Sequence, residues 1–77
     1  MTPELTLIVK TGCPYCAKVK RFMQKRRIDI PMQNTSDPEV VKFLIEKGGK
    51  EQVPCLFIDG EPMYESDDII AYLDKIF

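Results

Sequence analysis

Hydrophobic residues in the first third of the chain follow two different spacings. Leu5–Val9 is a mostly apolar, partly β-branched run without breakers, which predicts a short buried strand. In residues 17–26 the apolar positions recur at helical spacing and predict an amphipathic helix. One face of that helix would carry Val19, Phe22, Met23 and Arg26. Gly12 permits a tight turn between the two segments, and Pro14 suits the first position of the helix.

The middle of the chain predicts a second strand followed by a second helix. Residues 28–32 form the predicted strand, in which Pro31 suits an edge or a strand end. Ser36 is expected to cap the helix, because Glu39 three residues later completes a capping box. The two glycines at 48 and 49 are expected to end the helix. Its apolar face would consist of Val40, Val41, Phe43, Leu44 and Ile45.

The last third predicts a hairpin and a final helix. Residues 55–58 and 62–64 form short strands, joined by a two-residue turn at Asp59-Gly60, where both residues accept positive φ. Ser66 is expected to cap the final helix, with acidic residues in its first turn. The inward-facing residues of that helix would be Ile69, Ile70, Leu73, Ile76 and Phe77. The order β-α-β-α-β-β-α predicts an α/β fold, with a four-stranded mixed sheet flanked by three helices.

Composition limits the possible classes of protein. Seventy-seven residues predict a single domain over 1–77. The net charge of −1 argues against a general nucleic-acid binder, and the absence of histidine excludes histidine-based catalysis and histidine metal ligands. No apolar run is long enough to span a membrane, and residues 1–4 lack the features of a secretion signal. Three cysteines do not suit a secreted disulfide scaffold, so we expect a reducing cytoplasm.

Cys13 and Cys16 are the candidate chemical groups. Such a pair can form a disulfide, hold half of a metal site, or remain unused in a core. Cys13 falls at the predicted helix start, where unpaired N–H groups and the helix dipole stabilise a thiolate. We therefore expect Cys13 to be the nucleophile and Cys16 the resolving thiol. A disulfide that closes so short a loop contributes only about 2 kcal/mol, which favours redox exchange over a structural staple.

The segment Cys13-Pro14-Tyr15-Cys16 after a strand resembles the dithiol active site of glutaredoxins, which have the thioredoxin-like fold. Further along, Val53-Pro54 resembles the family's Val-Pro dipeptide with its cis proline. Residues 57–60 resemble the hairpin that follows it, and residues 66–69 resemble the opening of the last helix. The resemblance covers nearly the whole chain. It implies a glutathione-dependent thiol–disulfide oxidoreductase that binds no cofactor and uses glutathione as its reducing cosubstrate.

The resemblance also implies a binding site for glutathione. The backbone of Val53 would pair with the cysteine of the tripeptide like an added strand, and Pro54 would leave that edge open. Ser66 and Asp67 would hold the γ-glutamyl carboxylate and ammonium groups, or would only cap the helix. Glu65-Ser66 is similar to the Glu-Ser pair of soluble glutathione transferases. Tyr64-Glu65 stands where glutaredoxins commonly have Gly-Gly, which changes the expected approach of glutathione.

Three residues near the pair have two interpretations each. Lys10 matches a glutaredoxin lysine that would meet the glycine carboxylate of glutathione and stabilise the thiolate, or it is an exposed strand end. Tyr15 would cover the bound sulfur, or is only an exposed turn aromatic. Cys55 is a small core residue, or a third redox thiol close to the pocket.

Several functions compete on this evidence. The first is reduction of protein disulfides and protein–glutathione mixed disulfides by a monomeric enzyme. In a variant of it, thioredoxin reductase supplies the electrons. The second is a metal or iron–sulfur module. We do not expect it, because a zinc site requires four ligands and the cysteine pair supplies two. The third is a non-catalytic glutathione-binding domain. The expected partners are glutathione and protein disulfides, with no nucleic acid and no membrane.

Overall fold

The computed structural model describes residues 3–77, so two residues of the segment tested for a secretion signal, Met1 and Thr2, lie outside the described part. The elements follow the predicted order β-α-β-α-β-β-α. They are β1 (Leu5–Val9), α1 (Pro14–Arg26), β2 (Met32–Asn34), α2 (Pro38–Phe43) with its π-helical continuation η1 (Leu44–Gly48), β3 (Cys55–Ile58), β4 (Glu61–Met63) and α3 (Ser66–Ile76).

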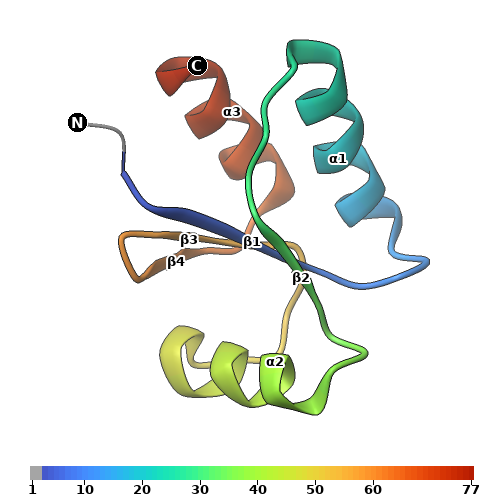
Figure 1. Ribbon diagram of the computed structural model, residues 1–77, viewed down its shortest axis with the longest axis vertical. Coiled ribbons are helices and arrows are strands. Elements are labelled where there is room, and N and C mark those ends of the chain that lie inside the picture. Colours follow the sequence, from blue (N-terminus) through green and yellow to red (C-terminus); the bar gives the residue numbers. More distant parts are fainter. Residues whose placement is uncertain (1–2) are drawn as a thin grey trace.

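The strands form one mixed sheet in the order β2-β1-β3-β4. β1 pairs with β2 in parallel and with β3 in antiparallel orientation, and β4 returns antiparallel to β3. In Figure 1, α1 and α3 cover one face of this sheet and α2 covers the other. The predicted α/β architecture, with a four-stranded sheet and three helices, is therefore confirmed.

The core has two parts, one on each face of the sheet. Alternate side chains of β1 point to opposite faces, so Leu7 packs toward α1 and α3 whereas Ile8 packs toward α2. The buried residues on the first face are Leu5, Leu7, Val9, Cys16, Val19, Met23, Ile28, Ile30, Leu56, Ile69 and Leu73. The buried residues on the second face are Ile8, Val40, Leu44, Cys55 and Phe57. Among the described residues, no helix is long and apolar enough to cross a membrane.

The prediction of a strand at residues 28–32 was wrong, because β2 begins only at Met32. Helix α1 ends at a left-handed Arg27, and the Ile28 amide donates to the Met23 carbonyl at 2.8 Å instead of joining the sheet. Pro31 has no N–H to donate, although its carbonyl accepts from Leu7 at 2.9 Å. The apolar residues of this segment therefore fill the core as a connection, and the ladder forms after the proline.

Both predicted serine caps were wrong. Helix α2 starts at Pro38, which occupies the first helical position and makes Asp37 the capping residue. The Asp37 carboxylate accepts from the Glu39 amide at 3.0 Å, so Ser36 takes no part in a capping box. In α3 the capping residue is Glu65, without a side-chain capping bond, and Ser66 is the first helical residue.

The predicted hairpin turn and the glycine end of the second helical segment are confirmed, whereas the predicted packing of the C-terminus is not. Asp59 and Gly60 both have positive φ, of 50° and 88°, as the predicted hairpin requires. Gly49 caps the second helical segment with φ of 94°. The fourth strand begins one residue earlier than predicted, at Glu61. The inward packing predicted for the end of α3 was wrong, because Ile76 and Phe77 remain 37% and 48% exposed there.

Truncating Leu56 should test the core. Leu56 is fully buried in the middle of β3, so Leu56→Ala should lower the free energy of unfolding by about 2–5 kcal/mol. As a control, Ile45→Ala removes carbon atoms from a side chain that is 46% exposed. That change should stay within about 1 kcal/mol in the same urea titration. Similar losses for both variants would contradict the placement of the core.

Candidate active site

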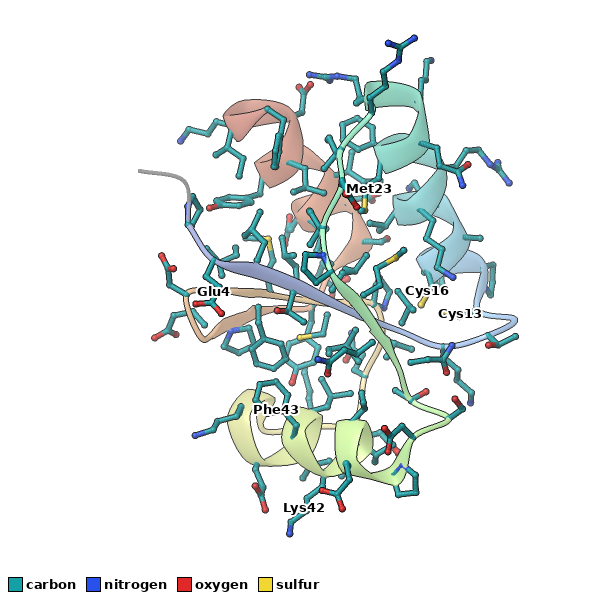
Figure 2. All side chains as sticks on the ribbon, viewed as in Figure 1. Glu4, Cys13, Cys16, Met23, Lys42 and Phe43 are labelled. Carbon is teal, nitrogen blue, oxygen red and sulfur yellow. The ribbon has the colours of Figure 1, made fainter. Side chains whose placement is uncertain are left out.

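Cys13 lies at the junction between β1 and α1. Gly12 has φ of 82° and turns the chain, and Cys13 is the extended capping residue of α1, with Pro14 directly after it. The Cys13 amide donates to the Lys10 carbonyl at 3.3 Å, which holds the loop together. Figure 2 shows Cys13 and Cys16 next to each other near the start of α1. The predicted helix start at the cysteine pair is thus confirmed.

The surroundings of Cys13 lower the pKa of its thiol below the usual 9.0. Partial burial raises the pKa, but the polar hydrogens of Cys16, both N–H and S–H, the Tyr15 amide and the charge of Lys10 together outweigh that effect. Within residues 3–77, no N–H group makes a close capping hydrogen bond to the Cys13 side chain, so the amides act on the sulfur at longer range. Cys13 is half-buried, which leaves its thiolate accessible.

The other two thiols have the opposite character. Burial raises the pKa of Cys16 to about 11, and a hydrogen bond to the Cys13 side chain and the negative charge of Cys13 act in the same direction. Burial also raises the pKa of Cys55 to about 11. Cys55 is fully buried and packs toward α2, on the face of the sheet away from α1, as the core interpretation requires. A nucleophilic thiolate near neutral pH is therefore favoured at Cys13 over the other two.

Most of the predicted glutathione contacts line one groove. This groove has a volume of about 320 Å³. The predicted residues along it are Tyr15, Val53, Pro54, Glu65, Ser66 and Asp67. They come from the start of α1, the loop before β3 and the start of α3. The Val53–Pro54 peptide is cis, as the family resemblance implies.

Lys10 and Cys13 lie outside that groove but in adjoining ones. Lys10 shares a cavity of about 230 Å³ with Val53, Thr35 and Glu51. It also shares a cavity of about 370 Å³ with Cys13. Val53 therefore lines both the groove and the 230 Å³ cavity. Lys10 lines that cavity and the one that contains Cys13. The sequence did not point to Thr35, Glu51 or Gln52, because no motif marks these positions.

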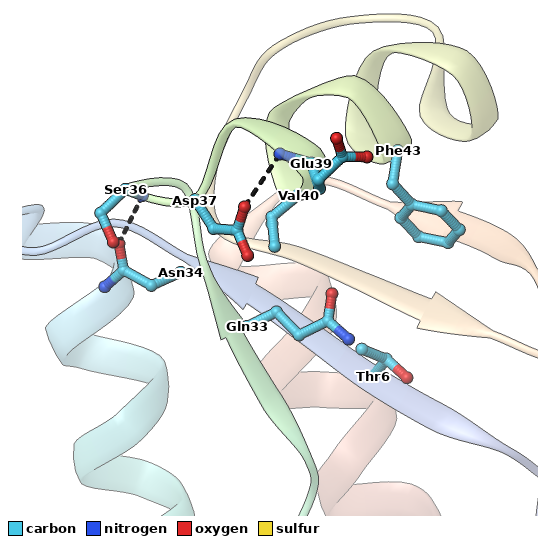
Figure 3. A pocket seen from close by; sticks show the side chains of 8 residues that line it. All are labelled: Thr6, Gln33, Asn34, Ser36, Asp37, Glu39, Val40 and Phe43. Carbon is cyan, nitrogen blue, oxygen red and sulfur yellow. Dashed lines mark hydrogen bonds between the residues drawn. The ribbon is translucent and has the colours of Figure 1, made fainter.

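A larger cavity, of about 560 Å³, lies between β2 and α2. Figure 3 shows its lining, in which Asn34 accepts from the Ser36 amide and Asp37 accepts from the Glu39 amide. None of the residues that line it is a cysteine, and these two polar side chains are engaged with the local backbone. Size alone therefore does not make it the candidate active site. Among residues 3–77, no group of three or more His, Cys, Asp or Glu side chains is arranged to hold a metal ion.

Tyr64, where the family resemblance implies a glycine, is anchored against the loop that follows η1. Its hydroxyl donates to the Lys50 carbonyl at 3.0 Å, and the Lys50 ammonium lies 4.8 Å from its ring centre. A Cβ atom on Gly48 would approach the Tyr64 hydroxyl oxygen to 1.9 Å. Tyr64 also lines the groove beside Glu65. The tyrosine therefore links the loop before β3 to the loop before α3.

Two ion pairs connect α1 with α3, and the sequence did not indicate either. Lys18 Nζ lies 2.5 Å from Asp67 Oδ1, and Arg26 pairs with Asp74 near the other end of both helices. The partners are about fifty residues apart in sequence, so no local spacing could reveal them. Asp67 is thus both a lining residue of the groove and the partner of a lysine.

Comparisons with known proteins point to one family. A protein-family model described as glutaredoxin matches residues 5–63. Glutaredoxin 1 of Rickettsia prowazekii is 36% identical over 81 residues, which span 92% of this chain and 85% of the relative. Glutaredoxin 3 of Escherichia coli is 24% identical over 71 residues, which span 88% of this chain and 83% of the relative.

Solved structures support the same fold. A crystal structure of a thioredoxin-like protein superposes with a TM-score of 0.79 at 20% identity, covering 95% of this chain and 99% of that one. The predicted thioredoxin-like fold is thereby confirmed. A glutathione S-transferase from Methylobacillus flagellatus, solved with glutathione bound, has a TM-score of 0.77 at 31% identity. That match covers 95% of this chain and 37% of the transferase.

Removing the charge of Lys10 should raise the pKa of Cys13. Lys10 acts on the Cys13 thiolate and Lys20 acts on Cys16, so Lys20→Met is a matched control. In Lys10→Met the pKa of Cys13, followed by thiolate absorbance in the ultraviolet, should rise slightly, because several groups share the stabilisation. The pKa should stay unchanged in Lys20→Met. Equal shifts in both variants would show that the lysine position does not matter.

Substituting Gly48 should destabilise the protein through Tyr64. Gly48 is the last residue of the π-helical segment η1 and does not have a positive φ, so Gly48→Ala would be harmless without the clash against the tyrosine hydroxyl. We expect a loss of about 1–3 kcal/mol in chemical denaturation. In a Tyr64→Ala background the same Gly48→Ala change should cost close to nothing. An undiminished cost in that background would show that the contact is not the cause.

Proposed function

The chain belongs to the glutaredoxin family and is a glutathione-dependent thiol–disulfide oxidoreductase, and we propose that Cys13 and Cys16 carry out its reaction. The proposed substrates are protein disulfides and protein–glutathione mixed disulfides. The observation that carries this assignment is the contrast between the thiols. The pKa of Cys13 is lowered, whereas that of Cys16 is raised to about 11.

The first step is attack of the Cys13 thiolate on a disulfide sulfur of the substrate. With a protein–glutathione mixed disulfide, a bond forms between Cys13 and the glutathione sulfur, and the protein thiolate leaves. A second glutathione thiolate then attacks the glutathione sulfur on Cys13. This releases glutathione disulfide and regenerates the Cys13 thiolate. The substrate thiol is thereby reduced, and its glutathionyl group leaves joined to one free glutathione as glutathione disulfide.

Cys16 provides a second route, which protein disulfides require. After Cys13 has formed a mixed disulfide, the Cys16 thiolate attacks Cys13 and releases the bound partner, leaving a Cys13–Cys16 disulfide. The negative charge of Cys13 is one cause of the raised pKa of Cys16, and that charge disappears in the mixed disulfide. Cys16 therefore becomes easier to ionise when its attack is needed. Two glutathione molecules then reduce the intramolecular disulfide.

The groove beside Tyr15 is the proposed place for glutathione. Val53 would pair with the cysteine backbone of the tripeptide, and Tyr15 would cover its sulfur, since Tyr15 lines the groove and is 63% exposed. The start of α3 at Ser66 and Asp67 would receive the γ-glutamyl end. Lys10, in the adjoining cavity, would meet the glycine carboxylate. The transferase of similar fold that was solved with glutathione bound supports, by analogy, glutathione as the ligand.

The remaining expectations stay predictions. A single domain over residues 1–77, a monomer, a cytoplasmic setting and the absence of nucleic-acid partners belong to this proposal. Reduction by thioredoxin reductase stays an alternative source of electrons. To distinguish the two electron sources, the same protein is supplied either with glutathione and glutathione reductase or with thioredoxin reductase alone. The rates of disulfide reduction are then compared.

Cysteine variants should separate the two roles. Cys13→Ser should abolish glutathione-coupled reduction, because the attacking thiolate is gone. Cys16→Ser should keep much of the activity on a glutathionylated protein but lose it on a protein disulfide, which needs the resolving thiol. The measurement is NADPH consumption coupled through glutathione reductase. Cys55→Ser is the matched control and should behave like the wild type. Equal activity of Cys13→Ser and Cys16→Ser would contradict the assignment of Cys13 as nucleophile and Cys16 as resolving thiol.

A further inference from the structure

The ion pair between Lys18 and Asp67 lies at the edge of the proposed glutathione groove. Asp67 lines that groove, and Lys18 Nζ is 2.5 Å from its Oδ1 atom. Lys18 is not itself a lining residue, but Tyr15, three residues earlier and on the same helix face, is. The carboxylate that lines the groove is therefore already bound by a cation of the protein, which belongs to α1.

We propose that Lys18 is a specificity-determining residue that competes with the α-ammonium group of glutathione for Asp67. This inference rests on the proposed function, in which that ammonium group meets Asp67. A carboxylate has enough lone pairs to accept from two ammonium groups at once. The two cations repel each other, however, and each receives only part of the negative charge. Lys18 thus reduces the preference of the groove for a ligand that carries an amino group.

The competition is expected to be modest. The Lys18 and Asp67 side chains are 53% and 81% exposed, so water and salt weaken the interaction. Two unit charges roughly 5 Å apart in water repel enough to change a binding constant about fourfold before salt screening. The effect should therefore be clear at low ionic strength and should shrink as salt is added.

The second ion pair between the same helices provides a matched control. Arg26 and Asp74 also join α1 to α3, but neither residue lines the groove. Lys18→Met and Arg26→Met each remove one cation and one interhelical pair. A merely structural role would make the two variants behave alike, whereas competition for glutathione is specific to Lys18.

The experiment compares two reductants, glutathione and desamino-glutathione, in which hydrogen replaces the α-amino group. KM is measured for both with the full chain at low ionic strength, and the KM of desamino-glutathione is divided by that of glutathione. In Lys18→Met this ratio should rise roughly two- to fivefold above the wild type. It should stay at the wild-type value in Arg26→Met and fall toward one in Asp67→Asn. If Lys18→Met does not fold, Lys18→Gln carries the same expectation.

The outcomes separate this inference from the proposed function. A ratio unchanged in Lys18→Met but lowered in Asp67→Asn would overturn the competition and leave the role of Asp67 intact. Parallel changes of both KM values in Lys18→Met also keep the ratio constant. They would overturn the inference by showing that Lys18 only attracts the anionic tripeptide. A ratio that Asp67→Asn leaves at the wild-type value would refute the assignment of Asp67 and the competition together.

Discussion

The chemistry depends on a sulfur atom held at the start of a helix. Cys13 caps α1, so the first amides of the helix, which have no partner within it, act on the sulfur and favour its ionised form. Partial burial works against ionisation, and the pKa falls only because the amides, the Cys16 thiol and Lys10 act together. Cys16, one turn further into the helix, is buried, and its pKa rises. One helical turn thus separates the attacking thiol, Cys13, from the resolving thiol, Cys16.

Strand pairing brings the rest of the site to the same place. Ile8 near the end of β1 pairs with Cys55 at the start of β3, so the cis Val53–Pro54 segment lies beside the loop that holds Cys13. Leu56 pairs with Met63, which carries the chain to the start of α3 on the same side. Three segments far apart in sequence therefore converge at one end of the sheet (Figure 1). The position of the groove therefore depends on the antiparallel pairing of β3 with β1 and with β4.

Local patterns in the sequence predicted most of the fold but not its long-range contacts. The strand at Leu5–Val9, the helix start at Pro14 and the Asp59-Gly60 turn depend on neighbouring residues, and all three are confirmed. The second strand was misplaced because the apolar residues before Pro31 serve the core and not the ladder. Pro38 occupies the first helical position, which makes Asp37 the capping residue in place of the predicted Ser36.

The candidate site shows the same division. The cysteine pair and the groove residues carry recognisable motifs, and the structure brings most of them together. The pairing of Lys18 with Asp67 and the anchoring of Tyr64 on Lys50 depend on how helices and loops meet in three dimensions. Such contacts leave no spacing in the sequence.

The most direct test is the pH dependence of alkylation of the three cysteines, followed site by site by mass spectrometry. Because only the thiolate reacts, each rate falls as the pH drops through the pKa of that thiol. The account predicts that Cys13 reacts with a pKa below 9.0, while Cys16 and Cys55 titrate near 11. A Cys13 pKa at or above 9.0, or a common pKa for all three thiols, would contradict it.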